Sequence, residues 1–254
     1  MPNHLIRLSY VGTAYHGFQI QANADTVQAR LQTALRTALG FLPDIKGCSR
    51  TDSGVHARAF YVSFCTPQPL DARRFLRSVN ALLPDDIRVH AIEQVPETFH
   101  ARYSAAGKVY EYLIYNSPVM DPFLNGRAVL FPGPFDCEAV NRALAPLLGR
   151  HDFSAFCGEK GKKEDMCRTL TRCAAAREGD LVRLTAAADG FLYNMVRIIA
   201  GTAMSAARGR LDAAGVAAIL ASGRRSLLCS TAPAEGLYLT RVEYHFEGTD
   251  CHQK

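Results

Sequence analysis

The sequence lacks the patterns that mark several large classes of protein. It has no run of about 18 consecutive apolar residues, the length that a membrane-spanning helix needs. Its first residues, MPNHLIRLSYVG, do not follow the charged and then apolar plan of a signal peptide. It contains no P-loop, no G-x-G-x-x-G and no zinc-type ligand spacing, so nothing indicates a nucleotide, redox or metal cofactor. We therefore expect a cytoplasmic protein.

Cysteine is present, but not in a pattern that indicates disulfides or a metal site. The eight cysteines include no C-x-x-C pair, and the cytosol keeps thiols reduced. Cys157, Cys167 and Cys173 lie near His151 in the sequence, but their spacing differs from that of the usual zinc sites. We expect reduced thiols and no metal ion.

Acidic residues are slightly fewer than basic residues: the sequence has 24 aspartates and glutamates and 29 lysines and arginines, which gives a net charge of +5. This mild excess permits an anionic partner without requiring one. The positive charge is concentrated in residues 159–172 and 207–210. Composition alone favours solvated basic loops for these stretches, and the alternative is a surface that follows phosphate groups.

Hydrophobic periodicity predicts strands and helices in both halves, so that each half could be a sheet covered by helices. In the first half it predicts strands over 4–12, 59–66 and 86–95 and helices over 25–40 and 70–84. The second half is expected to follow as strand 107–116, helix 136–149, two strands within 170–190, helix 191–207, helix 211–223 and strand 236–246. Pro146 should shorten or kink the first helix of this half, because proline removes a donor and clashes with the preceding turn.

The pattern of strands and helices in each half predicts two subdomains, 1–106 and 107–247, followed by a frayed tail over 248–254. No low-complexity linker separates them, and strand residues resume at once after the boundary near Gly107. The joint should therefore not be flexible.

A polar segment, GCSRTDSGVHARAF (47–60), interrupts the apolar pattern of the first half. Arg50 and Asp52 lie between two glycines, and they share a side if the segment is extended. Read alone, the segment favours a structural Arg50–Asp52 pair in a turn. A hydrolase that uses Cys48 and His56 is a weaker alternative, because nothing specifies an orienting group or an activated thiolate.

Two further residues could carry chemistry. Tyr110 alternates with Tyr112 and Ile114 on one strand face, which is usually a core pattern but can also be a platform for stacking bases. Arg197 lies in the predicted helix FLYNMVRIIAGTAMSAA, whose surroundings are apolar nearly all round. A buried arginine needs an anion. That anion could be a carboxylate nearby in the sequence, or Asp52 from the other half of the chain.

Six blocks of the sequence, in order over about residues 4–246, resemble the TruA family of tRNA pseudouridine synthases. The blocks are YVGTAYHGFQIQ, TVQARLQTAL, GCSRTDSGVHA, FHARYSAAGKVYEYLIYN, DGFLYNMVRIIAG and AEGLYLTRVEY. The sequence departs from the family pattern at Ser53, where alanine is usual, and at Phe18, where tryptophan is common. Pro146 interrupts a helix that is commonly continuous. None of these departures touches the positions expected to act.

The resemblance implies an α+β pseudouridine synthase fold, in which two α/β subdomains with mostly antiparallel sheets join around a central basic cleft. It places Asp52 on the family's catalytic aspartate and Arg50 on its companion. It places Tyr110 on the tyrosine that stacks on the target uracil, and Arg197 on the arginine that pairs with the aspartate. It also implies isomerisation of uridine to pseudouridine at positions 38, 39 and 40 of the tRNA anticodon stem-loop, by a homodimer and without a cofactor.

One site that handles three adjacent positions should recognise RNA shape and backbone more than base identity. The basic stretches then suit contacts with the RNA backbone. The residues expected to make them are Arg58, Lys160, Lys162, Lys163, Arg208 and Arg210. The alternative function is a non-catalytic RNA-binding protein on the same scaffold, and the intact Asp52, Tyr110 and Arg197 argue against it.

Overall fold

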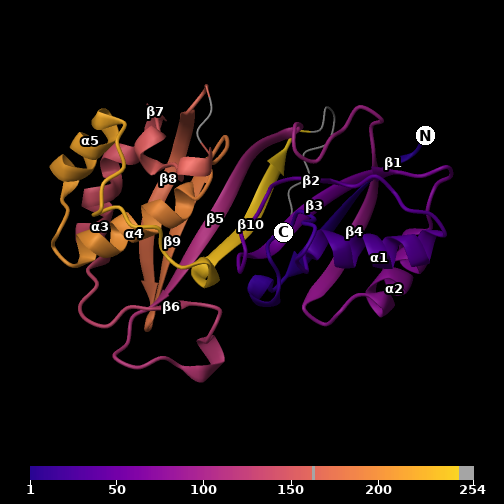
Figure 1. Cartoon of the computed structure of the whole chain (residues 1–254), viewed down its shortest axis with the longest axis horizontal. Coiled ribbons are helices and arrows are strands. Elements are labelled where there is room, and N and C mark those ends of the chain that lie inside the picture. The colour runs from indigo at the N-terminus through magenta and orange to yellow at the C-terminus, as the bar shows by residue number, and fades with distance from the viewer. Residues whose placement is uncertain (162–163, 246–254) are drawn as a thin grey trace.

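The computed structural model describes residues 1–161 and 164–245, and it contains a large sheet with helices packed against it (Figure 1). The strands are β1 (Asn3–Tyr10), β2 (Lys46–Gly47), β3 (His56–Cys65), β4 (Ile87–Val95), β5 (Ala105–Tyr115), β6 (Val129–Leu130), β7 (Gly149–Asp152), β8 (Cys167–Glu178), β9 (Leu181–Ala188) and β10 (Leu237–Tyr244). The helices are α1 (Val27–Leu39), α2 (Ala72–Leu82), α3 (Cys137–Leu144), α4 (Met195–Ala207) and α5 (Ala213–Ser222). The expected tail over 248–254 lies outside the described residues.

Within the described residues the sheet has ten strands in the order β4-β1-β3-β10-β5-β9-β8-β7, with β2 paired to β3 and β6 paired to β5. Most neighbours are antiparallel, as predicted, while the β3–β10 and β5–β6 pairs are parallel. The β3–β10 pair consists of only Tyr238↔His56 and Leu239↔Ala57. This short pair joins strands from the start of the chain to strands from its second half, so that one sheet runs through both.

The helices end where local chemistry predicts. The Thr26 hydroxyl accepts a hydrogen bond from the Ala29 N–H at 3.3 Å and caps the start of α1, and Gly40 closes the helix in the left-handed conformation at φ 79°. Val27, Leu31, Ala34 and Leu35 of α1 face inward and are buried. Pro146 shortens α3 as expected, since α3 ends at Leu144 and a single 3₁₀ turn, Ala145–Leu147, follows.

The prediction of a helix from residue 191 is wrong at its start, because α4 begins at Met195. Asn194, just before it, has φ 62°, a left-handed conformation that interrupts the helical path. All residues of α4 except Arg197 and Ala207 are buried, which confirms that the helix is enclosed nearly all round. No helix in the described parts of the chain is long and apolar enough to cross a membrane.

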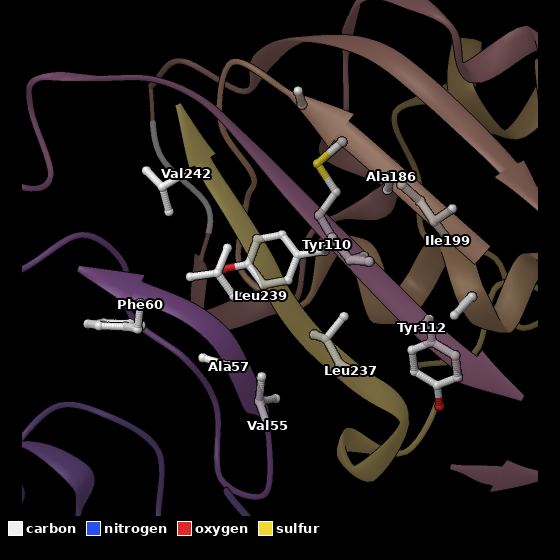
Figure 2. Close-up of a cluster of buried hydrophobic side chains, with 14 of the residues drawn as sticks. Val55, Ala57, Phe60, Tyr110, Tyr112, Ala186, Ile199, Leu237, Leu239 and Val242 are labelled. Atoms are coloured by element: carbon white, nitrogen blue, oxygen red, sulfur yellow. The ribbon is translucent and has the colours of Figure 1, made fainter. Parts of the chain in front are cut away.

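The hydrophobic core is continuous across the short parallel pair. Figure 2 shows apolar side chains from β3, β5, β9, β10 and α4 gathered around the joint. Tyr112 on β5 is fully buried, and its hydroxyl donates a hydrogen bond to the Pro233 carbonyl oxygen at 2.8 Å. Ile199 on α4 and Leu239 on β10 are fully buried in the same cluster. Burial of this surface holds α4 against the sheet and so determines where Arg197 lies.

Candidate active site

A cavity of about 680 Å³ is lined by segments from both halves of the chain. The first half contributes residues between His16 and Gln21, the loop 49–53 and Arg102. The second half contributes β5 side chains, the turn 191–194 and the start of α4. Asp52 and Tyr110, which the sequence analysis singled out, both line this cavity.

Arg197 and Asp52 form an ion pair at its edge. Arg197 Nη1 lies 3.1 Å from Asp52 Oδ2 and 3.2 Å from Asn194 Oδ1, and its Nε donates to the Ala232 carbonyl oxygen at 2.8 Å. The guanidinium is therefore held from three directions, which fixes the carboxylate that it pairs with. The geometry confirms that Arg197, which is partly buried, pairs with an anion and that the anion is Asp52.

The loop that carries Asp52 is shaped by the backbone of the segment after β1. Thr51 is held there by two contacts: its hydroxyl lies 2.9 Å from the Tyr10 hydroxyl, and its carbonyl oxygen accepts a hydrogen bond from the Phe18 N–H at 3.4 Å. A Cβ at Gly17, which has φ +84°, would lie 2.3 Å from the Thr51 carbonyl oxygen, and one at Gly12 would lie 1.9 Å from the Val55 carbonyl oxygen. These two glycines allow the close approach that positions the loop. The block that contains both glycines resembles a family motif, but their role in positioning the loop was not predicted from the sequence.

Tyr110 presents a buried ring to the same space. Its side chain is 6% exposed, its hydroxyl lies 3.2 Å from Ser49 Oγ, and its ring meets the Phe191 ring edge to face at 5.2 Å. Burial raises the pKa of the Tyr110 phenol, so the group stays neutral at physiological pH. Phe191 also lines the cavity, and sequence reasoning missed it because it was placed within a helix.

Positive charge dominates the cavity wall. The lining cations among the described residues are Arg50, Arg102, Lys108, Lys160 and Arg168, and Asp52 is the only carboxylate there. Lys160 was predicted to contact RNA. Arg168 lies in the basic stretch 159–172 but was not among the residues expected to make such contacts, and Arg102 and Lys108 were missed because each lies singly in the sequence. Lys162 and Lys163 lie outside the described residues.

The other basic residues expected to contact RNA lie elsewhere. Arg58 stacks over the Tyr238 ring at 5.3 Å, and Tyr238 faces away from the cavity because its neighbour Leu237 lines it. Arg208 stacks over the Phe131 ring at 4.5 Å, just beyond the C-terminal end of α4. The 13-residue helix is about 20 Å long, so Arg208 and the nearby Arg210 lie far from Asp52.

The structure contradicts the two interpretations of segment 47–60 made from that segment alone. Arg50 forms no ion pair with a described residue, and Asp52 pairs with Arg197 instead. Cys48 is fully buried and its sulfur accepts from the Tyr61 N–H, and burial raises the pKa of its thiol to about 11. A hydrolase would need a thiolate that this environment disfavours.

His56 is occupied by the backbone on both sides and is not free to act as a base. Its Nδ1 accepts a hydrogen bond from the Gly12 N–H at 2.9 Å, so the ring proton is on Nε2, which donates to the Glu235 carbonyl oxygen at 3.0 Å. Its ring also stacks on Tyr238 at 4.5 Å. His56 therefore links three segments next to the Asp52 loop. Within residues 1–161 and 164–245, no group of three or more His, Cys, Asp or Glu side chains is placed to hold a metal ion.

Comparison with known proteins gives one consistent result. The sequence model of a family described as tRNA pseudouridine synthase matches residues 7–104 and 143–245. A tRNA pseudouridine synthase A from Acetivibrio thermocellus is 43% identical over 244 residues, covering 96% of this chain and 100% of the relative. Proteins of the same name from Ruminiclostridium cellulolyticum and Geobacillus kaustophilus are 41% and 39% identical, and each match covers 94% of this chain. The matches cover 98% and 93% of those two relatives.

Proposed function

The chain belongs to the tRNA pseudouridine synthase family, and we propose that it isomerises uridine to pseudouridine at positions 38, 39 and 40 of the tRNA anticodon stem-loop. The observation that carries the proposal is the Asp52–Arg197 pair, 3.1 Å apart, at the edge of a basic cavity that also presents Tyr110. The activity is that of an isomerase acting on a uridine of tRNA. The three positions follow from the resemblance of the six sequence blocks to the TruA family.

The reaction exchanges one bond to the ribose for another. The N1–C1′ bond breaks, the uracil turns, and a C5–C1′ bond forms, while the proton at C5 is lost and N1 gains one. The atoms balance without a redox partner or a nucleotide. The catalyst needs an ionised carboxylate at the sugar and a pocket that keeps the detached base from leaving.

Asp52 is the carboxylate that we assign to this role. Arg197 favours its ionised form through a charge-assisted hydrogen bond and fixes its orientation. Two routes fit this geometry: attack by Asp52 on a carbon, or removal of the ribose 2′ proton. Both routes require the same ionised oxygen to face the sugar.

Tyr110 and Arg50 complete the proposed site. The target uridine must leave its stack to reach Asp52, and the Tyr110 ring supplies a face on which the uracil can stack while it turns. Phe191 meets that ring edge to face and holds it in place. Arg50 is exposed in the cavity wall without an ion-pair partner among the described residues, which suits it to contact the RNA or to fill the space that the flipped nucleotide leaves.

The charge of the cavity wall supports RNA as the ligand. Five lining cations face a single lining carboxylate among the described residues, which attracts a polyanion. Lys160 lines the cavity, which suits it to contact the backbone of a bound stem-loop. Arg58, Arg208 and Arg210 lie away from the cavity, so their proposed contacts require parts of the tRNA beyond the target loop.

We also propose that the enzyme acts in the cytoplasm as a homodimer, so that one tRNA touches both subunits. Within one chain, residues 1–106 carry Asp52 and residues 107–247 carry Tyr110 and Arg197, as two subdomains around the cleft. The cavity lining drawn from both halves supports this division.

The decisive experiment is to incubate the purified protein with unmodified tRNA and map pseudouridine by nucleotide position. Pseudouridine at 38, 39 and 40 supports the full proposal. Pseudouridine elsewhere supports the synthase and contradicts the positions. Binding of tRNA without any pseudouridine would instead favour the non-catalytic RNA-binding protein.

A further inference from the structure

Lys108 places an ammonium group in the cavity wall without a described carboxylate to neutralise it. It precedes Tyr110 by two positions on β5, so the two side chains lie on the same face of the strand, and both line the cavity. Lys108 Nζ donates to the Cys48 carbonyl oxygen at 2.9 Å, its only hydrogen bond to a described residue. An ammonium has three N–H donors, so two remain for a ligand.

Arg102 brings a second positive charge to the same place. Burial lowers the pKa of the Lys108 ammonium, and the nearby charge of Arg102 lowers it further. Arg102 is positioned from outside the cavity, since its backbone N–H donates to His100 Nδ1 at 3.0 Å and its guanidinium lies over the Tyr103 ring at 5.7 Å. Neither cation forms an ion pair with a described carboxylate.

Lys108 is half-buried, and the exposed Arg102 places a like charge near it in the same cavity wall. Such an arrangement is unfavourable unless an anion joins the two cations. The lining carboxylate, Asp52, is already paired with Arg197. From this arrangement we propose that Lys108 and Arg102 form a phosphate subsite, which binds one backbone phosphate next to the target uridine. Phosphate oxygens accept hydrogen bonds from ammonium and guanidinium groups alike.

The phosphate subsite would hold the sugar in place during the reaction. It rests on the proposed function, because it takes RNA as the ligand of the cavity. The uracil must rotate while C1′ stays at Asp52. A phosphate held by Lys108 and Arg102 anchors the sugar on the same side as Tyr110. Loss of the anchor should therefore slow the chemical step as well as weaken binding.

The test uses stem-loop RNAs in which one phosphate at a time, from two nucleotides before the target uridine to two after it, is a neutral methylphosphonate. The second-order rate constant under single-turnover conditions, which corresponds to kcat/KM, is measured for the wild type, Lys108→Met and Arg102→Met. On unmodified RNA each variant should be about tenfold or more slower, the usual effect of losing a charged hydrogen bond. When the methylphosphonate is at the linkage that the subsite binds, kcat/KM of the wild type should fall by a similar factor. The same substitution should lower kcat/KM of the two variants only slightly, because they have already lost the contact.

The matched control is Arg73→Met on α2, which removes an equal charge from a residue that does not line the cavity. A methylphosphonate at the sensitive linkage should lower kcat/KM of Arg73→Met by the same factor as that of the wild type. Equal losses for the wild type and both cavity variants at every linkage would overturn the subsite and leave Lys108 as a support for the Cys48 carbonyl.

A separate measurement keeps the subsite testable if the wild type makes no pseudouridine, a result that would contradict the proposed function itself. The salt dependence of tRNA binding reports phosphate contacts without requiring catalysis. Each cavity variant should reduce the slope of log K against log salt by about 0.7 to 0.9, the value for one phosphate contact. An unchanged slope in both variants would overturn the subsite.

Discussion

The Arg197 side chain on α4 and the Asp52 side chain ahead of β3 meet across 145 positions of sequence, with Nη1 and Oδ2 3.1 Å apart. Both groups are partly shielded, since 19% of the Arg197 side chain and 25% of the Asp52 side chain are exposed. The pair connects a helix of the second half to a loop of the first. Because it also opens to the cavity, either partner can be changed without emptying the hydrophobic core.

Asp52→Asn should leave a folded protein that binds tRNA and forms no pseudouridine. The amide has nearly the shape of the carboxylate, but it can neither attack a carbon nor take a proton. Pseudouridine mapping and a tRNA binding assay measure the two effects. Asp44→Asn is the control, because Asp44 is an exposed carboxylate paired with Lys46 outside the cavity, and it should keep full activity. Turnover by Asp52→Asn would remove Asp52 from the catalytic role.

Arg197→Lys should keep the fold and lower kcat at least about tenfold, the loss expected for one charged hydrogen bond, with a smaller effect on KM. Lysine retains the charge but not the fork that reaches Asp52, Asn194 and the Ala232 carbonyl at the same time. Steady-state kinetics on tRNA separates the two parameters. A variant that raised only KM would show that Arg197 binds RNA and does not position Asp52.

Features that depend on nearby residues could be predicted from the sequence. The apolar spacing, Thr26 and Gly40 define α1 almost to its ends, because a helix of this kind is determined by its own face and caps. That Arg197 needs an anion was also predictable, since an arginine in a helix that is apolar nearly all round requires one. The choice of Asp52 over a carboxylate nearby in the sequence came from the family resemblance, and the structure confirms it. Charge balance alone required an anion without identifying it.

Contacts between distant segments were not predictable from the residues that make them. Nothing in the β10 sequence specifies that it pairs in parallel with β3 over two residues. Phe191 looked helical because it continues the apolar pattern of α4, and only the left-handed Asn194 sets it apart. Lys108 looked like an ordinary polar strand residue, and its importance appears when the fold places it in the wall of the Asp52 cavity.

Gly201→Ala should destabilise the protein and lower activity as well. A Cβ at this position of α4 would lie 1.9 Å from the Ser230 carbonyl oxygen, so the helix or the loop must shift. Overpacking of this kind costs about 1 to 3 kcal/mol, measured as the free energy of unfolding in urea. Gly215→Ala on α5 is the matched helical control, since the new methyl meets chiefly the flexible end of Leu211 at 3.1 Å. Equal losses in the two variants would contradict the steric explanation.

Thiol alkylation at neutral pH should modify the enzyme without abolishing activity. Cys65 is exposed, whereas Cys48 is fully buried and burial raises the pKa of its thiol to about 11, so little reactive thiolate is present beside the Asp52 loop. Peptide mass spectrometry after brief iodoacetamide treatment should find Cys65 labelled and Cys48 unlabelled while pseudouridine formation continues. Activity lost in step with Cys48 labelling would show that the cavity is open to that thiol.

His56→Gln should reduce the sensitivity of the fold to acid. Burial lowers the pKa of His56, so the folded protein resists a proton that the unfolded chain accepts near pH 6.5, the usual histidine value. Above that pH both states are neutral and His56 adds no pH dependence. As the pH falls below it, the unfolded state gains a proton first, and the free energy of unfolding drops by up to about 1.4 kcal/mol per pH unit until the folded-state pKa is reached.

Glutamine can accept from the Gly12 N–H and donate to the Glu235 carbonyl without titrating, so the variant should lack this part of the acid loss. Burial also lowers the pKa values of His4, His90 and His100, but these groups are present in both proteins and cancel in the comparison. Urea unfolding at pH 7.5 and pH 5.5 measures the difference. Between pH 7.5 and pH 5.5 the free energy of unfolding should fall more for the wild type than for the variant. Only the wild type must keep a buried imidazole neutral at the lower pH. An equal loss in the two proteins would mean that His56 takes up its proton as readily in the folded state as in the unfolded state, which would contradict a role of burial in keeping the ring neutral.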